Sequence, residues 1–432
     1  MSRAAAFLKE QARRLVLSRA GGGIDLTRLD KVPDRLTWPL RRDGMDPLSR
    51  LGELREREPV HRLTSFFGMT VWLVTGEAEA REVLADTTSY SNDIRPYVGA
   101  RGSTTDGDIG GLGFTDPPEH TRLRRLLTPE FTMRRLERLR PVIAEIVDRQ
   151  LDEVERLAGA GEGEVDLVPS FAFPVPFLVI CELLGLPDED RETFRQLGSA
   201  RFDVTYGGQG TLGAVSESRR FLMEATRKQR RDPGPGLIGQ LIRQHGDQIN
   251  DFDLGGLADG VFTGGLETSA SMLALGTAVL LDHPEDYRRV ADDPAVVEAT
   301  VEELLRYLSV VQVAFPRFPK QDVELAGHRV AKGDVVICHL TAANRDGRTG
   351  TGREHFDPAR PPSPHLAFGH GFHRCVGAEL ARMELRIAFP ALARRFPELR
   401  LAVPDRPFRQ RSIVYGIDSL PVRLTCQVST LL

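Results

Sequence analysis

Cysteine is scarce in this chain, and its four cysteines, Cys181, Cys338, Cys375 and Cys426, lie far apart. No two of them form a C-x-x-C pair, so the ligand spacing of a structural zinc site is missing. The same spacing excludes the disulfide framework of a small secreted domain and is typical of a protein from a reducing compartment. Any chemistry that depends on sulfur must therefore use single thiols.

Long hydrophobic runs are also missing, since no apolar stretch approaches the roughly 20 residues that span a bilayer. Residues 2–20 are rich in arginine, with apolar side chains at near-helical spacing, and they contain no secretory h-region. A transit peptide or a membrane-surface helix would fit this segment, but a short amphipathic extension fits it better. We predict a cytoplasmic protein with an N-terminal extension over residues 1–40 and one large domain over residues 41–432.

Excess charge is absent too, because a net charge of −4 is small for 432 residues and indicates no nucleic-acid partner.

The pattern of apolar and polar residues predicts a mainly α fold with small β-sheets. Residues 47–85 read as a helix, a hairpin and a helix, and residues 116–281 are almost wholly helical. Within them, residues 251–281 are apolar or small nearly all round, as in a helix at the centre of a protein. Short β-type runs follow over residues 311–338, and a last long helix over residues 376–396.

The stretch before this last helix, FGHGFHRCVG over residues 368–377, has the composition of a metal-thiolate loop. Cys375 would lie at a helix N-terminus, where unpaired N–H groups and the helix dipole stabilise a thiolate. Phe368 could cover the sulfur, while Gly369, Gly371 and Gly377 would let the backbone turn tightly and approach a flat ligand. The alternative is a buried structural cysteine.

This run resembles the haem-ligand loop of the cytochrome P450 family, F-x-x-G-x-x-x-C-x-G, and every fixed position of that pattern is filled. The resemblance implies one domain that holds haem b (iron protoporphyrin IX) between the long central helix and the helix after the cysteine loop. It also implies that the Cys375 thiolate is the proximal ligand of the haem iron.

The central helix carries the run Gly264-Gly265-Leu266-Glu267-Thr268-Ser269. An acid beside a hydroxyl in an apolar helix needs an explanation, because burying a charge without a partner is costly. The run resembles the family motif [A/G]-G-x-[D/E]-T-[T/S], whose acid and threonine deliver protons to iron-bound dioxygen. That resemblance assigns these roles to Glu267 and Thr268. The alternative is that Thr268 bonds back to its own helix and Glu267 pairs elsewhere.

Two further resemblances involve charged residues. Glu303 and Arg306 form an E-x-x-R pair, which by default is a surface ion pair of a few tenths of a kcal/mol. In the family this pair joins an arginine from an F-x-P-x-R segment, here Arg360, and has a structural role.

Haem propionates need cations and donors. The resemblance assigns this role to four residues: His120, Arg124, Arg317 and His373.

A thiolate ligand favours O–O cleavage, so the resemblance implies a monooxygenase that hydroxylates or epoxidises a small molecule, in secondary metabolism. No flavin or nicotinamide module is found, so electrons would come from a ferredoxin or flavodoxin with an NAD(P)H-dependent reductase. If they share the cysteine face, seven arginines would steer such an acidic partner: Arg124, Arg125, Arg134, Arg135, Arg138, Arg374 and Arg382.

We predict a bulky, mainly hydrophobic substrate, because the segments expected around the pocket are small or apolar. They supply Leu257, Gly260, Val261, Gly264, Val311, Val313, Ile413 and Val414. Glycine-rich loops at residues 99–113 and 203–213 would open and close over it. Two alternatives stay open: a peroxide-driven haem-thiolate peroxygenase, which would not need Glu267 and Thr268, and a non-enzymatic haem sensor or carrier.

Overall fold

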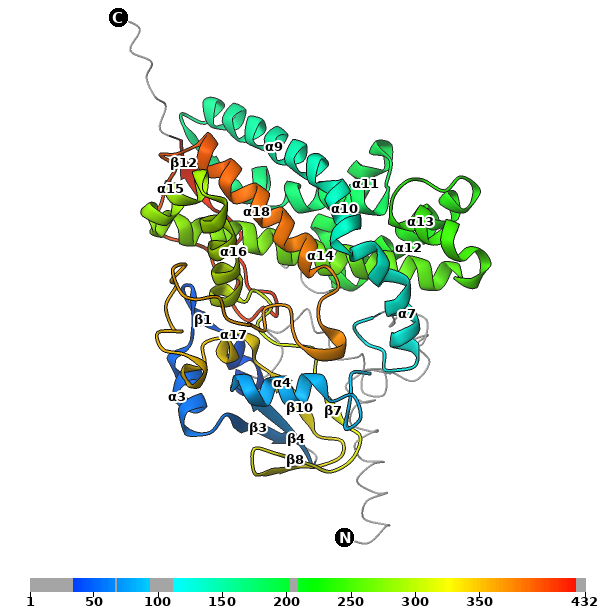
Figure 1. Cartoon of the computed structure of the whole chain (residues 1–432), viewed down its shortest axis with the longest axis vertical. Helices are drawn as coiled ribbons and strands as arrows, with labels where there is room; N and C mark the ends of the chain where they lie inside the picture. Colours follow the sequence, from blue (N-terminus) through cyan, green and yellow to red (C-terminus); the bar gives the residue numbers. More distant parts are fainter. Residues whose placement is uncertain (1–33, 67, 94–111, 203–208, 425–432) are drawn as a thin grey trace, which may run out of the picture.

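The computed structural model describes residues 34–66, 68–93, 112–202 and 209–424. These residues form a large helical part and a smaller part built on short strands (Figure 1). The helical part contains the following elements: α7 (Glu119–Leu127), α8 (Met133–Leu136), α9 (Arg140–Ala160), α10 (Pro174–Leu184), α11 (Asp188–Phe202), α12 (Gln209–Arg231), α13 (Leu237–His245), α14 (Asp251–Asp282), α15 (Pro284–Asp292), α16 (Pro294–Leu308) and α18 (Ala378–Arg395).

The strand-containing part is assembled from an early and a later segment of the chain, residues 34–91 and 318–343. Strand β4 pairs antiparallel with β3 and parallel with β10, and this small sheet packs beside α4 (Figure 1). The elements are α2 (Asp34–Thr37), β1 (Arg42–Asp43), β2 (Asp46–Pro47), α3 (Ser49–Arg57), β3 (Val60–Phe66), β4 (Met69–Val74), α4 (Glu77–Ala85), β5 (Tyr90–Ser91), β7 (Phe318–Pro319), β8 (Val323–Leu325), β9 (His328–Val330), β10 (Val335–Cys338) and α17 (Leu340–Ala343). A further three-stranded sheet orders β11 (Arg400–Leu401), β12 (Pro421–Arg423) and β6 (Glu164–Asp166).

Helix α14 runs through the centre of the helical part. The Asn250 side chain caps it by accepting a hydrogen bond from the Asp253 N–H at 2.7 Å, and Pro284 begins the next helix just after its end. By length and composition alone this helix could cross a membrane, but 67% of its most apolar window is buried inside the protein. It packs in the main hydrophobic cluster with α9, α10, α16 and α18. The predicted central helix is therefore confirmed as a core helix.

Arg42 joins the start of the described chain to this core. It is buried, and its guanidinium donates to Gln312 Oε1 at 2.8 Å, to the Leu308 carbonyl at 2.7 Å and to Thr341 Oγ1 at 2.9 Å. The guanidinium also lies over the Tyr415 ring, 4.2 Å from its centroid. The boundary between residues 40 and 41 stays a prediction, and the structure packs Leu40 into buried surroundings as well.

Candidate active site

The cysteine loop connects an irregular segment to α18, as predicted. A short 3₁₀ turn (Gly371–His373) shapes it, and the Cys375 N–H donates to the Phe368 carbonyl at 2.9 Å. Gly369 and Gly371 both have φ of +69°, in the left-handed region. Gly371 also lies against α4, where an added Cβ would come within 2.7 Å of the Ala85 Cα. Gly377 has φ of −85°, which any residue adopts, so the turn itself needs glycine at the first two positions only.

Cys375 differs from the two other described cysteines. Cys181 and Cys338 are buried, and burial raises the pKa of each to about 12. The Cys375 residue keeps solvent-accessible surface, although protein atoms surround it closely enough for burial to raise the thiol pKa. The Gly377 N–H and the charges of Arg124, Arg374 and Arg382 act in the opposite direction and stabilise the thiolate. The site thus holds an accessible thiol with thiolate-stabilising groups around it.

A cluster of cationic and N–H-bearing side chains lies beside this loop. The rings of His120, from α7, and His373 lie 4.2 Å apart. Burial, then the charge of Arg124, lowers the pKa of His120 to about 4. Burial, then His120 and Arg317, lowers the pKa of His373 to about 3. His120 is buried, and neither of its ring nitrogens has a hydrogen-bond partner. The cluster is therefore suited to an anion that accepts hydrogen bonds.

The two predicted arginines reach this region from different elements. Arg124 donates from α7 to the Arg374 carbonyl at 2.7 Å, next to the cysteine. Arg317 is buried, and it donates to the Asn92 side chain and, at 2.9 Å, to the Phe315 carbonyl. Asn92 was not predicted, because nothing in its local sequence signals a partner so far along the chain.

The acid and hydroxyl of α14 are both engaged in the structure. Thr268 Oγ1 donates to the Gly264 carbonyl at 2.6 Å, and Glu267 forms an ion pair with Arg409 at 3.4 Å. Both contacts match the alternative weighed in the sequence. The Thr268 oxygen still keeps acceptor lone pairs, since donation uses only its proton. Gly260 and Gly264 are exposed although α14 is a core helix, so this face of the helix borders accessible space.

The expected pocket walls come together from distant segments. Val311 forms an isolated bridge with Val414, the Gln312 N–H donates to the Ile413 carbonyl at 2.9 Å, and Val313 bridges to His339. Val261, Val311, Val313, Ile413 and Val414 are all partly exposed. Leu257 is buried in the main hydrophobic cluster, at 2% exposure, and offers no accessible surface. The loop expected at residues 99–113 lies mainly outside the described residues.

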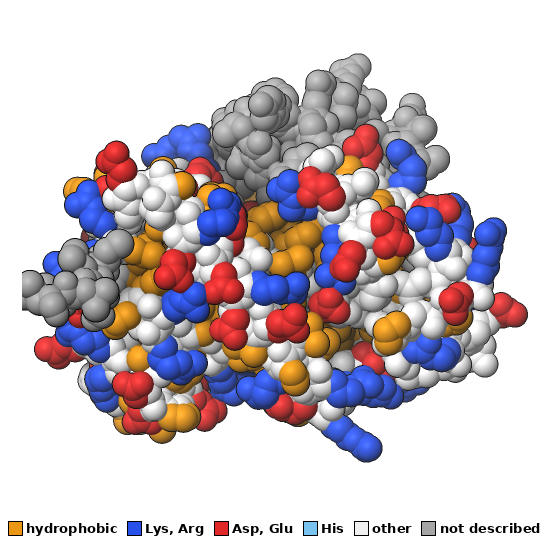
Figure 2. Space-filling model, turned by 90° about the horizontal axis from the view of Figure 1, so that it is seen from above, with side chains coloured by type: hydrophobic (Ala, Val, Ile, Leu, Met, Phe, Trp, Pro, Cys, Tyr) orange, Lys and Arg blue, Asp and Glu red, His pale blue; other side chains and the backbone are white. Residues whose placement is uncertain are grey.

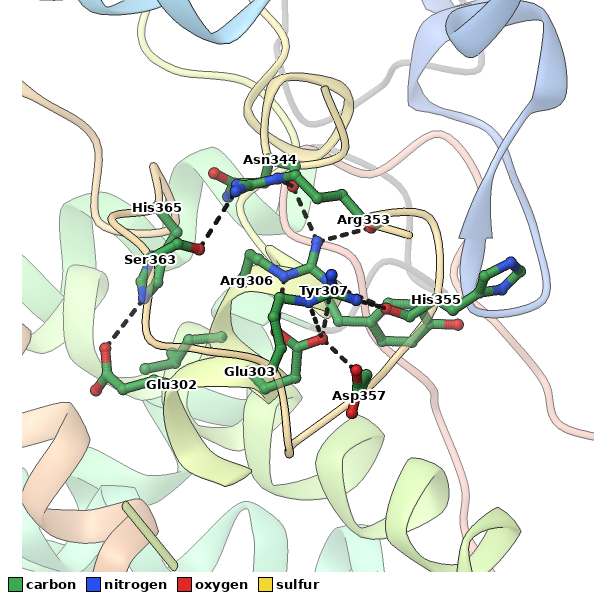
Figure 3. A network of polar contacts seen from close by, with 12 residues as sticks. Glu302, Glu303, Arg306, Tyr307, Asn344, Arg353, His355, Asp357, Ser363 and His365 are labelled. Atoms are coloured by element: carbon green, nitrogen blue, oxygen red, sulfur yellow. Dashed lines mark hydrogen bonds and ion pairs between the residues drawn. The ribbon is translucent and has the colours of Figure 1, made fainter. Parts of the chain in front are cut away.

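The E-x-x-R pair is buried and rigidly held. Both carboxylate oxygens of Glu303 accept from Arg306 at 2.7 Å (Figure 3). Arg360 lies 3.6 Å from the same carboxylate. The Arg306 guanidinium also donates to three backbone carbonyls of the irregular segment and its approach, those of Asn344, Arg353 and His355. The pair therefore fastens the chain that leads to the cysteine loop.

Comparison with known proteins decides the family. The family profile described as Cytochrome P450 matches residues 37–229 and 211–413. The chain belongs to the cytochrome P450 family. Cytochrome P450 165B3 of Amycolatopsis orientalis is 39% identical over 393 residues, which cover 89% of this chain and 97% of that protein. The P450 monooxygenase PikC of Streptomyces venezuelae is 36% identical over 386 residues, which cover 88% and 91%.

Solved structures agree with the fold of this P450. OxyE, a cytochrome P450 involved in teicoplanin biosynthesis, superposes with a TM-score of 0.82 at 36% identity, covering 89% of this chain and 99% of that chain. The predicted mainly α fold with small sheets is thereby confirmed, as is an oxidoreductase of the P450 monooxygenase class. The alternative of a non-enzymatic sensor or carrier was wrong.

The P450 family uses haem held through a cysteine thiolate, and the described residues fit that group. Haem carries two propionate carboxylates, which would supply the acceptors that the buried His120 nitrogens lack. The accessible thiol of Cys375 lies next to this cluster, within electrostatic reach of Arg124. When bound, the group supplies oxygen activation, and the chain supplies the thiolate, the counter-charges and the cavity.

Proposed function

We propose that this P450 inserts one oxygen atom from dioxygen into a bulky, mainly hydrophobic small molecule in secondary metabolism, by hydroxylation or epoxidation. Cys375 is the iron ligand, and His120, Arg124, Arg317 and His373 hold the propionates. The observation that carries this assignment is the accessible thiol at the start of α18, beside a buried histidine with two unpartnered ring nitrogens.

The substrate class rests on the pocket walls. The accessible face of α14 offers Gly260, Val261 and Gly264, which leave room because a Cβ on either glycine would meet nothing within 4 Å. The bridged segments around Val311 and Val414 add apolar surface. Small and apolar walls of this kind favour a bulky hydrophobic ligand. One relative, the Nocardicin C N-oxygenase of Nocardia uniformis subsp. tsuyamanensis, is 38% identical over 375 residues and is named for the oxygenation of a small molecule.

Thr268 and Glu267 hold and move protons in this proposal. The Thr268 hydroxyl is fixed by its bond to the Gly264 carbonyl, and its oxygen can accept a further hydrogen bond on the accessible side. Glu267 connects through Arg409 to Asp418, which is 58% exposed and accepts from Arg409 Nε at 2.5 Å. This chain of contacts links the α14 acid to the solvent.

Electrons come from an acidic ferredoxin or flavodoxin and its NAD(P)H-dependent reductase, in the cytoplasm. Next to the cysteine loop lies a hollow of about 510 Å³ that is lined by His120, Thr121, Arg124, Arg125, Thr128, Pro129, Thr132 and Phe372. The exposed apolar side chains of Met133 and Phe372 stand among exposed arginines, here called the arginine rim: Arg125, Arg134, Arg138 and Arg374. An apolar centre with a cationic rim fits a small acidic redox protein. Arg382 is tied to Glu302 and Glu379 and takes no part in this rim.

The carbon monoxide difference spectrum of the reduced protein tests the ligand assignment. We expect a strongly red-shifted Soret band, as a thiolate ligand gives, and its loss in Cys375→Ala. Cys338→Ala is the control, because that thiol is buried elsewhere and should leave the band unchanged. A band like that of histidine-ligated haem in the fresh protein, or a band that survives Cys375→Ala, would overturn the assignment.

A further inference from the structure

Arg382 lies at the junction of α18, α16 and the cysteine loop. Its guanidinium lies over the Phe368 ring, 4.7 Å from the centroid. Its Nε and Nη2 donate to the two oxygens of Glu302 at 2.6 and 2.9 Å, and Nη1 donates to Glu379 at 3.0 Å. The Arg382 side chain is only 13% exposed, so these contacts hold it in one position.

The charge of Arg382 acts on the cysteine. Phe368, which it covers, accepts the hydrogen bond of the Cys375 N–H on its carbonyl. The Arg382 charge is one of three that favour the ionised thiol, together with Arg124 and Arg374. Arg382 is more enclosed than Arg374, because its side chain is 13% exposed and that of Arg374 is 48% exposed. Charges that solvent screens less act over a longer range.

Glu302, on α16, compensates this charge. Burial alone would raise its pKa, but hydrogen bonds from His365 and Arg382 outweigh burial and hold the pKa at about 2. The carboxylate is therefore ionised near neutral pH. Figure 3 shows Glu302 directed at His365, whose Nε2 lies 3.2 Å from its Oε2. Glu302 thus offsets the charge of Arg382, with a longer contact to Arg386 at 3.4 Å, and also fastens the chain that enters the cysteine loop.

We propose that the Glu302–Arg382 pair sets the reduction potential of the haem iron by fixing the net charge next to the Cys375 loop. The inference rests on the proposed role of Cys375 as ligand. Reduction of the iron by one electron adds one negative charge at the site. An uncompensated cation near the sulfur stabilises the reduced state and raises the potential, whereas an uncompensated anion lowers it. Glu302 and Arg382 are positioning residues with opposite effects.

The test is a spectroelectrochemical titration of the haem-loaded protein, with dithionite as reductant and ferricyanide as oxidant. Glu302→Gln should raise the iron potential, and Arg382→Gln should lower it. The double variant, which removes both charges, should return close to the wild-type value. A purely structural role of the pair predicts a different pattern, in which both single variants shift the potential in the same direction and the double variant shifts it further.

Two controls make the outcome decisive. Glu298 lies one turn earlier on the same helix, its side chain is 66% exposed, and it pairs with Arg386. Glu298→Gln should therefore leave the potential unchanged. Arg382→Lys keeps the charge but loses the bidentate contact, and should stay near wild type. A shift in Arg382→Lys as large as in Arg382→Gln, or no shift in Glu302→Gln, would overturn the proposal. The red-shifted carbon monoxide band has to persist in every variant, so that failure of this inference is separable from failure of the ligand assignment.

Discussion

Thr268 is a residue whose hydroxyl is satisfied within its own helix and is still available for chemistry. Its proton goes to the Gly264 carbonyl, and its lone pairs stay free for a second contact. We expect Thr268→Ala to keep consuming electrons while product formation falls, because proton delivery loses its last hydroxyl. The measurement is the ratio of product formed to NAD(P)H consumed, with Thr268→Ser as the control that retains the hydroxyl. Unchanged coupling in Thr268→Ala would contradict the proposed role of Thr268 in proton delivery.

Glu384 is a second residue whose surroundings predict a measurable behaviour. It is buried on α18 and bonds to Ser269 of α14, and its Oε2 has no hydrogen-bond partner. Burial raises the pKa of Glu384 to about 8, so the folded protein holds a proton that the unfolded chain loses above its ordinary pKa near 4.5. Stability should therefore fall as the pH rises from about 4.5 to about 8.

Glu384→Gln removes this penalty, since the amide stays neutral at every pH. We expect the variant to unfold in urea with a free energy equal to wild type at pH 4 and higher at pH 9. Each unit of pKa shift corresponds to about 1.4 kcal/mol, so the gain at high pH reaches a few kcal/mol. A gain of the same size at pH 4 would point to packing and would contradict this account of the carboxyl group.

Residues of this kind mark the limit of sequence reasoning. Cys375, Glu303 and His120 were predicted because each belongs to a pattern of fixed local spacing. Glu384, Arg409 and Asn92 have no such pattern, because their partners lie far away along the chain. Only the folded arrangement reveals them, since burial and pairing depend on which distant elements meet.

At the scale of elements, the cysteine loop depends on its contact with α4. Gly371→Ala would place a methyl group within 2.7 Å of the Ala85 Cα and force a non-glycine residue to a φ of +69°. Gly369→Ala meets only the second cost, of about 1–2 kcal/mol, because no atom lies within 4 Å of its added Cβ. We expect Gly371→Ala to lose haem on purification, measured as the ratio of Soret to protein absorbance, and Gly369→Ala to retain most of it.

Elements with a strong local period were predicted well. The hairpin around Gly68 and the helices α4 and α14 have nearly the expected bounds. The sheet of β11, β12 and β6 was missed, because its strands are two or three residues long and β12 pairs with β6 across more than half of the chain. Residues 209–213, expected in a loop, begin α12, since glycine weakens but does not prevent a helix that packs against α14.

At the scale of the whole molecule, the surface charges are mixed, and basic side chains are concentrated in one region. The face seen in Figure 2 mixes acidic and basic side chains, with apolar groups in the hollows between them. The arginine rim around Met133 and Phe372 gathers four exposed arginines on a protein with a net charge of −4, and they outnumber the acids Glu137 and Glu379 beside them. Such a patch steers an acidic partner over a distance that salt shortens.

Charge reversal tests this docking surface. Arg134→Glu with Arg138→Glu should slow the association of an acidic ferredoxin by about tenfold or more at low salt, with the difference fading at high salt. Stopped-flow reduction of the iron under carbon monoxide measures this rate. Arg50→Glu with Arg57→Glu on α3 is the matched control, because it changes the net charge by the same amount and Figure 1 places that helix away from α7 and the loop beside it. An equal loss in the control would mean that net charge alone governs the encounter.

The buried guanidinium of Arg42 has a consequence for recombining this protein with its relatives. Arg42 donates a hydrogen bond to Gln312, which lies between Val311 and Val313. The β1–β2 segment and this wall of the pocket are therefore held together. A chimera that takes residues 34–47 from one parent and residues 308–313 from another would separate Arg42 from the acceptor groups with which it pairs in its own protein. Crossover points for such hybrids should therefore keep both segments from the same parent, although more than 200 residues separate them.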